Sequence, residues 1–409
     1  MKLLFLWLFC AESWIVRTNI PRVLWGKRIM LNGPQKISSN QSPFDGIGHI
    51  TSVVFNENEA VISEVIIPKE KNEVRFPLSD YIERNYISML GKLPYVLCKP
   101  KTVQSGTRNT AVVRFNNQYY AVEESCRPVK LKYDENDELY YNGTSKSIPR
   151  MAAHQPDDYS TFSYVYGEKY PLTLNNSFVI PWKPKTIPFL MHDCKRTGDM
   201  KYYIWPIMSS GIGRIKEYFK KIIRMPIDQY TSKSGWLIYD QENNKCHEIM
   251  MDEYADIFHI SHIDKVDDNI YKLYASFVYN FAGWVTGIDE LNIKFKEVTL
   301  DLKTNDIVDV LDTGINMDFL HKQGDIIIGS SLDNYPSVIK YNVKTKTHVK
   351  LYLPGNTVRE IVPYDDYLLY FSHEKQISCL NIARQGDGEI VTSIKIPHRL
   401  PGFHATLFS

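Results

Sequence analysis

The sequence predicts an all-β protein built as one large domain. Its 409 residues include 27 Tyr and 18 Phe, and aromatic side chains favour strands over helices. Short apolar or alternating segments recur between clusters of Asn, Asp, Gly and Lys, which is the pattern of strands joined by turns. No Pro-rich or Gly/Ser-rich linker divides the chain, and single all-β domains can reach comparable lengths.

The predicted strands lie along the whole chain, and the clearest of them are residues 111–115, 119–122, 326–328, 337–341 and 367–371. The last nine residues, PGFHATLFS, are apolar and aromatic, whereas chain ends are usually polar and frayed. We therefore expect this segment to form a strand that ends inside the protein. Many short strands in one long domain suit a β-propeller, whose innermost strands meet beside a central axis.

Composition excludes some functions. Lys and Arg total 48 against 47 Asp and Glu, a net charge of +1, which argues against nucleic acid as a partner. The six cysteines form no CxxC pair, so neither a zinc site nor a disulfide framework is indicated. Reduced thiols and a cytoplasmic location are the default interpretation.

Residues 1–17 are interpreted as a segment before the main domain of residues 18–409. Lys2 precedes an apolar run at residues 3–11, which has the form of a short signal peptide. Glycosylation sequons at Asn40, Asn142 and Asn175 fit secretion. A membrane-docking or core segment is the alternative interpretation, and no apolar run is long enough to cross a bilayer.

Four histidines stand in apolar or strand-like surroundings. His154 follows Met-Ala-Ala, His192 lies in Phe-Leu-Met-His-Asp, His259 lies in Ile-Phe-His-Ile, and His404 lies in the apolar tail. They are too far apart in sequence to share a local ligand motif, so only the fold could bring them together. On this basis alone, a hydrogen-bonded core histidine is the more common reading of each residue.

A series of short peptides changes that weighting. These are IPRVLWG at 20–26, LNGP at 31–34, FDGIG at 44–48, NTAVV at 109–113, the Glu-Ser pair at 124–125, and then the four histidine peptides. Their order resembles that of the carotenoid cleavage oxygenase family over about residues 18–409.

The resemblance implies a seven-bladed β-propeller with a helical and loop cap over the metal-bearing face. It also implies one catalytic Fe(II) held by His154, His192, His259 and His404. Acidic residues would accept the outer ring N–H groups of these ligands and so orient them. The matching positions here are Glu124, Asp318 and Glu360, of which Asp318 is a shorter carboxylate than the family's usual one; a surface carboxylate is the alternative reading of each.

Some positions depart from the family pattern. His262 stands where the family usually has Asn, so either His259 or His262 could be the third ligand, and the preceding Phe258 favours His259. Ile47, Gln35 and Cys194 are further departures. Some relatives dock on membranes through an acylated cysteine, and Cys98 lies in the corresponding region, with an inert thiol as the alternative. The chain is also shorter than most relatives, which leaves its substrate open.

The resemblance implies a dioxygenase that cleaves a conjugated C=C bond of a carotenoid, apocarotenoid or stilbene-like substrate with O₂, giving two carbonyl products. An apolar tunnel would hold the substrate. Two alternatives are an iron-dependent retinoid isomerase and hydrolase, which needs no O₂, and a propeller that binds apolar ligands without catalysis. We also expect deletion of residues 404–409 to abolish metal binding far more than it lowers stability.

Overall fold

A computed structural model gives the architecture of the chain. It describes residues 12–35, 46–68, 107–124, 126–148, 150–156, 160–164, 170–175, 177–184, 187–188, 191–210, 233–279, 291–331, 337–355, 358–396, 398, 400, 402 and 404–409. Within these ranges the protein is all β apart from one 3-10 turn, η1 (Arg22–Leu24). The predicted fold class is thereby confirmed.

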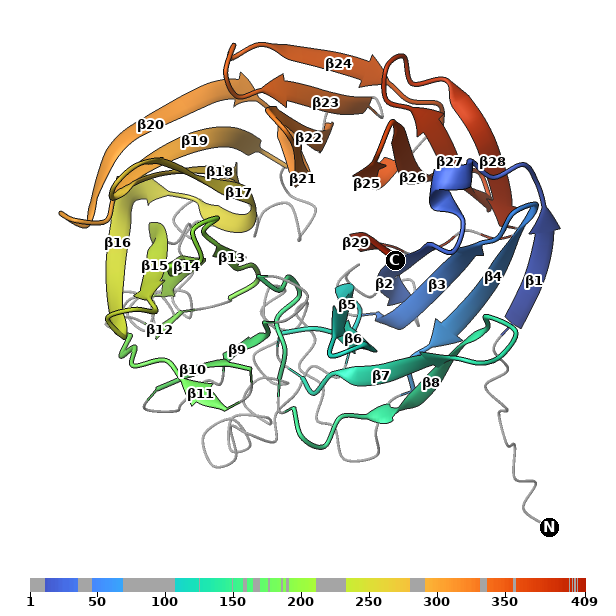
Figure 1. Ribbon diagram of the computed structural model, residues 1–409, viewed down its shortest axis with the longest axis horizontal. Helices are drawn as coiled ribbons and strands as arrows, with labels where there is room; N and C mark the ends of the chain where they lie inside the picture. The colour runs from blue at the N-terminus through green and yellow to red at the C-terminus, as the bar shows by residue number, and fades with distance from the viewer. Residues whose placement is uncertain are drawn as a thin grey trace, which may run out of the picture.

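Seven antiparallel sheets form a ring around a central axis (Figure 1). The first contains β1 (Glu12–Arg17), β2 (Arg28–Gln35), β3 (Ile47–Phe55), β4 (Glu59–Ile66) and β29 (His404–Phe408). The second contains β5 (Ala111–Phe115), β6 (Gln118–Val122), β7 (Val129–Tyr133) and β8 (Leu139–Thr144). The third contains β9 (Phe162–Tyr164), β10 (Leu172–Leu174) and β11 (Phe178–Val179).

The remaining sheets follow in chain order. The fourth contains β12 (Ile187–Pro188), β13 (Lys195–Arg196), β14 (Tyr202–Ser210), β15 (Lys233–Asp240) and β16 (Lys245–Tyr254). The fifth contains β17 (Asp256–Asp267), β18 (Ile270–Val278), β19 (Ile293–Asp301) and β20 (Asp306–Ile315). The sixth contains β21 (Met317–Gln323), β22 (Ile326–Ser331), β23 (Ser337–Asn342) and β24 (His348–Tyr352), and the seventh β25 (Val358–Tyr364), β26 (Tyr367–Glu374), β27 (Ile377–Arg384) and β28 (Ile390–Ile396).

The C-terminal strand closes the ring. β29 pairs antiparallel with β2, so that His404 lies opposite Asn32, and it occupies the edge of the first sheet nearest the axis (Figure 1). Glycine permits the close approach at this junction, because a Cβ on Gly33 would lie 2.3 Å from the Cα of Gly402. The apolar tail is therefore an inner strand, as its composition predicts.

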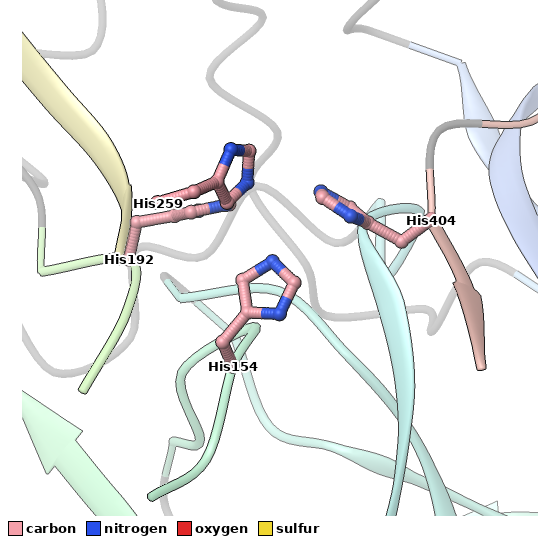
Figure 2. A group of neighbouring side chains, drawn as sticks. All are labelled: His154, His192, His259 and His404. Atoms are coloured by element: carbon pink, nitrogen blue, oxygen red, sulfur yellow. The ribbon is translucent and has the colours of Figure 1, made fainter. Parts of the chain in front are cut away.

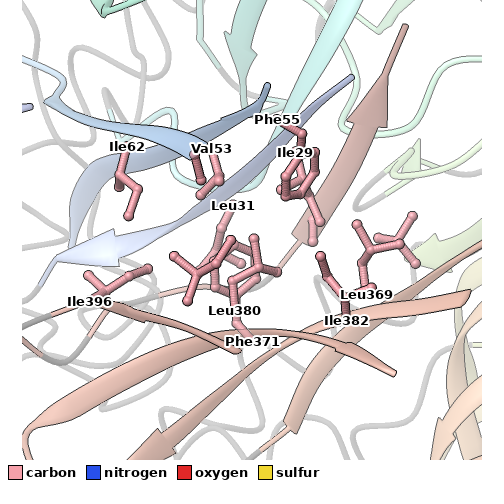
Figure 3. Close-up of a cluster of buried hydrophobic side chains, with 14 of the residues drawn as sticks. Ile29, Leu31, Val53, Phe55, Ile62, Leu369, Phe371, Leu380, Ile382 and Ile396 are labelled. Atoms are coloured by element: carbon pink, nitrogen blue, oxygen red, sulfur yellow. The ribbon is translucent and has the colours of Figure 1, made fainter. Parts of the chain in front are cut away.

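Apolar residues at every second strand position fill the space between neighbouring blades. Between the seventh and first blades, the alternating pairs Ile29 and Leu31 on β2 and Leu369 and Phe371 on β26 are fully buried (Figure 3). Period-two alternation puts these side chains on one face of each sheet. The same packing that closes the ring thus fixes β29 and the histidine it carries.

Two sequence predictions require comment. Residues 12–17, assigned above to the N-terminal segment, form β1. All six of these residues pair with β4, so the propeller begins by residue 12. No α-helix occurs within the described ranges, and the helical cap stays a prediction. The apolar run at 3–11, Asn40 and Cys98 lie outside the described residues.

Cys246 and Cys379 are free thiols. Among the described residues, no helix is long and apolar enough to cross a membrane.

Candidate metal centre

The four predicted histidines meet near the axis of the propeller. His192 lies between β12 and β13, His259 is on β17, His404 begins β29, and His154 lies just before β9. Figure 2 shows their rings pointing toward one another from separate elements. One nitrogen from each ring lies within 4.8 Å of one nitrogen from every other ring. The propeller therefore brings together residues that no local motif connects.

β-Bulges aim several of the side chains at this centre. The pairing of β17 with β18 shifts register between Ile257 and Ile260, on either side of His259. Corresponding shifts occur in β21 beside Asp318 and in β25 around Glu360. An extra residue in one strand bends it and redirects the side chains at the bulge. The three neighbouring inner strands β17, β21 and β25 thus each have a β-bulge at the point where a polar residue faces the axis.

A carboxylate orients each of three histidines. Nδ1 of His259 lies 2.8 Å from Asp318 Oδ1 and Nδ1 of His404 lies 3.1 Å from Glu360 Oε2, while Nδ1 of His192 is hydrogen-bonded to Glu124 Oε1. Ionised carboxylates can only accept hydrogen bonds, so each Nδ1 carries the proton. In a neutral imidazole, this leaves the lone pair on Nε2.

The arrangement of the nitrogens fits a bound metal ion. Nε2 of His192 and Nε2 of His259 lie 3.1 Å apart; when both rings are neutral, two lone pairs face each other at this distance and repel unless a cation lies between them. Two ligands at right angles, each about 2.1 Å from a metal, would be separated by about 3.0 Å. Nε2 of His154 is buried with no hydrogen-bond partner among the described residues. A metal would satisfy such a nitrogen.

Electrostatics keeps two of the rings neutral. Burial lowers the pKa of His154 well below its usual value, and the three neighbouring imidazoles lower it further. Burial also lowers the pKa of His404 and outweighs the opposing effect of Glu360. Burial acts to lower the pKa of His259 as well, but Asp318 raises it overall. Neutral imidazole is the form that binds metals.

Two of the carboxylates, Asp318 and Glu360, stay ionised. Burial acts to raise the pKa of Asp318, but His259 holds it below its usual range. For Glu360, burial is opposed by His321 and His404, which lower its pKa. Glu360 also accepts the backbone N–H of Ala405 at 2.8 Å. This carboxylate thus fixes both the ring of His404 and the start of β29.

A cavity of about 250 Å³ opens beside the centre, next to His154 and His259. Most of the other side chains that line it are polar or charged, namely Asp193, Lys195, Ser261, His321, Lys322, Gln323 and Glu360. This lining differs from the apolar tunnel predicted for a polyene, and that tunnel stays a prediction.

Some residues at the centre were not anticipated from the sequence. Phe319 packs on the rings of His259 and His404 and has a positive φ of 55°, which is unusual for an aromatic residue. Buried Asp193 accepts the backbone N–H of Ile260 at 2.8 Å and so ties the His192 loop to β17. In the sequence, Asp193 could have been noticed only because it directly follows His192.

His262, the alternative third ligand, lies away from the centre. Its Nε2 is 3.3 Å from Asp264 and its side chain is 42% exposed. His259 joins the cluster instead. The choice of His259 over His262, which the preceding Phe258 favoured, agrees with this placement. Phe258 itself packs edge-on against His192.

Comparisons with known proteins give a match in structure alone. No protein-family profile and no curated protein matches the sequence. A variant of the apocarotenoid oxygenase of Synechocystis superposes with a TM-score of 0.71 at 14% identity, covering 98% of this chain and 96% of that one. The lignostilbene dioxygenase of Pseudomonas brassicacearum gives a TM-score of 0.68 at 14% identity, with 97% and 95% covered.

A cobalt-substituted form of the Synechocystis enzyme also superposes, with a TM-score of 0.68 at 15% identity over 97% of this chain and 96% of that one. The resemblance read from the motifs is thus confirmed at the level of the fold. The chain has the seven-bladed propeller architecture of the carotenoid- and stilbene-cleaving oxygenases.

Proposed function

We propose that this protein is a non-haem Fe(II) dioxygenase that cleaves a conjugated C=C bond of a carotenoid, apocarotenoid or stilbene-like substrate with O₂, giving two carbonyl products. The observation that carries the proposal is the cluster of four histidines, of which three are buried and held by carboxylates. The shared fold with an apocarotenoid oxygenase and a lignostilbene dioxygenase supports it.

His154, His192, His259 and His404 would hold the iron. When bound, Fe(II) would supply one-electron chemistry for the activation of O₂. Neither a carboxylate ligand nor a 2-oxoacid cosubstrate is required by this donor set.

The surrounding residues prepare the centre. Glu124, Asp318 and Glu360 fix the tautomers of their histidines, so that Nε2 of each ring keeps its lone pair toward the axis. Phe319 packs against two of the rings. The chain thus supplies a preorganised set of donors.

The test is an iron and product assay. The purified protein should contain one iron per chain and should convert one member of a panel of carotenoids, apocarotenoids and stilbenes to two carbonyl products in air. Both products should carry label from ¹⁸O₂. Anaerobic removal of iron should abolish turnover and Fe(II) should restore it.

A matched pair of variants separates the centre from its surroundings. His192→Ala should lose iron and activity, whereas His262→Ala, three residues after a proposed ligand, should keep both. Full activity of His192→Ala would contradict the proposal. Products that form equally well without O₂ would indicate the isomerase and hydrolase instead, and iron-free protein that binds polyenes without turnover would indicate a binding protein.

A further inference from the structure

A second group of potential metal ligands lies in the first blade. His49 on β3, Glu64 on β4 and His398, between β28 and β29, each place one ligand atom within 4.8 Å of the others. Glu64 Oε1 is 2.9 Å from Nε2 of His398, and Glu64 Oε2 is 3.4 Å from Nε2 of His49. None of these residues belongs to the four-histidine cluster.

The strand register explains how the group forms. Thr51 on β3 lies directly opposite Glu64 on β4, and His49 is two residues away from Thr51 on the same face. Such diagonal neighbours are within reach of long side chains. Thr51 Oγ1 donates to Glu64 Oε1 at 3.2 Å, which orients the carboxylate. The backbone alone therefore brings the imidazole and the carboxylate together.

His398 is held in place from other directions. Its ring stacks on His49 with an interplanar angle of 12° and meets the edge of Trp14. Its carbonyl oxygen accepts the N–H of Ser378 at 3.1 Å. The ring is partly open to solvent, with 39% of the side chain exposed, so an ion could reach the group from outside.

Within this group, the buried ring of His49 has no hydrogen-bond partner in the described part of the chain. His49 is only 5% exposed, and neither of its ring nitrogens has a hydrogen-bond partner among the described residues. Leaving a buried polar group unpaired is costly. A cation between the three residues would give Nε2 of His49 a partner, and the Glu64 carboxylate lies within reach of the same ion.

We propose that His49, Glu64 and His398 form a second metal site, which binds a divalent transition-metal ion such as Zn²⁺. Two imidazoles and one carboxylate are a common donor set for such ions. With metal–ligand bonds of about 2.1 Å, neighbouring donor atoms are about 3.0 Å apart at a right angle and about 3.4 Å apart at a tetrahedral angle. The observed separations, 2.9 Å from Oε1 of Glu64 to His398 and 3.4 Å from Oε2 to His49, are close to these values, with one carboxylate oxygen facing each histidine.

The position of the site gives it a role in closing the ring. It joins β3 and β4 of the first blade to the segment that leads from the seventh blade into β29. β3 lies two strands away from β29, or about 10 Å at the usual strand spacing. The second ion is therefore distinct from the iron, and it stabilises the closure that positions His404.

Cobalt titration of metal-stripped protein tests the proposal. Equilibrium dialysis and elemental analysis should find two equivalents of Co²⁺ bound to the wild type and one to Glu64→Gln or His49→Gln. Glutamine keeps much of the shape of the side chain it replaces in Glu64→Gln, so the fold should be retained, as circular dichroism can check. Zn²⁺ should raise the Tm of the wild type more than that of either variant.

A control addresses local disturbance. His373 is as buried as His49, and its Nδ1 is hydrogen-bonded to Ser378 Oγ at 2.8 Å. The backbone N–H of Ser378 in turn donates to the carbonyl oxygen of His398. His373→Gln disturbs this neighbourhood but leaves all three donors, so it should still bind two equivalents. Loss of the second equivalent in His373→Gln as well would show that the group is only a hydrogen-bonded cluster.

The double variant His192→Ala/His259→Ala separates this proposal from the proposed iron centre. It should bind one equivalent, at the second site, and adding Glu64→Gln should remove that equivalent. A wild type that binds one equivalent, unchanged by Glu64→Gln, would overturn the second site and leave the four-histidine centre intact. If the double variant does not fold, comparison of the wild type with Glu64→Gln decides the question alone.

Discussion

The contributions of His404 and Phe408 to metal binding and to stability can be separated by experiment, although both lie on β29. His404 faces the axis with its Nδ1 on Glu360, whereas Phe408 is 6% exposed and packs against Tyr119 with ring centroids 5.1 Å apart. We expect His404→Ala to lose the metal at moderate cost in stability, and Phe408→Ala to do the reverse.

The magnitudes follow from the contacts. After His404→Ala, the Glu360 carboxylate would keep its bonds from His321 at 3.0 Å and from the backbone N–H of Ala405. Losing one hydrogen bond to a charged group costs about 1–3 kcal/mol of unfolding free energy. Truncating a buried phenylalanine costs about 3–5 kcal/mol, so Phe408→Ala should be the less stable variant.

The assay combines metal analysis with denaturant unfolding. Unfolding should be measured on metal-free proteins, because a bound ion stabilises the folded state by itself. Iron content should fall from one per chain to near zero in His404→Ala and stay near one in Phe408→Ala at a temperature where it is folded. Stoichiometric iron in His404→Ala, or equal loss of iron in both folded variants, would refute this reasoning.

This comparison replaces the deletion of residues 404–409. The deletion would remove the whole partner of β2 together with buried Ala405 and Phe408. Stability would then fall together with metal binding, so the deletion is a poor way to compare the two effects. Point substitutions are the sharper test.

Three further outcomes are expected. Asp318→Asn would no longer select one tautomer of its histidine and should lower iron affinity by about 10–100-fold, as measured by competition with a chelator; unchanged affinity would show that the carboxylate is dispensable. Gly33→Ala would place a methyl group against the backbone of Gly402 and should lower the Tm, whereas Gly143→Ala, where nothing lies within 4 Å, meets only its own backbone strain and should lower it less. Burial acts to raise the pKa of Asp264, but hydrogen-bonded histidine and lysine side chains hold it well below the usual range. The ionised carboxylate therefore stabilises the fold above the unfolded-state pKa of about 3.9, and this contribution is lost as pH falls below that value. In urea unfolding, the difference in unfolding free energy between wild type and Asp264→Asn should narrow from pH 6 toward about pH 3.

The clustering of the four histidines could be predicted from sequence because each of them stands in a peptide that resembles a family motif. Asp318 could be named from the Met-Asp-Phe peptide, and its 2.8 Å contact with His259 agrees with that choice. The bulges that aim these residues could not be read, since a bulge depends on the register of two strands that pair only in the fold. The positive φ of Phe319 was hidden for the same reason.

Other features depend on contacts between distant parts of the chain. His49, Glu64 and His398 show no local pattern, because the third residue joins the other two only when the ring closes. The start of the propeller was placed too late because the apolar run at 3–11 continues with little break into β1. Local periodicity predicts strands well, but it does not say where a domain begins.

The pairing of β29 with β2 also has a consequence for how the protein folds. These strands come from opposite ends of the chain, so their contact has a very large sequence separation, and such contacts slow folding. During synthesis, His154, His192 and His259 all leave the ribosome long before His404. Until β29 is made, the first blade lacks its innermost strand, and its surface facing the seventh blade remains open to aggregation. The complete four-histidine cluster can therefore form only after the last strand has been made.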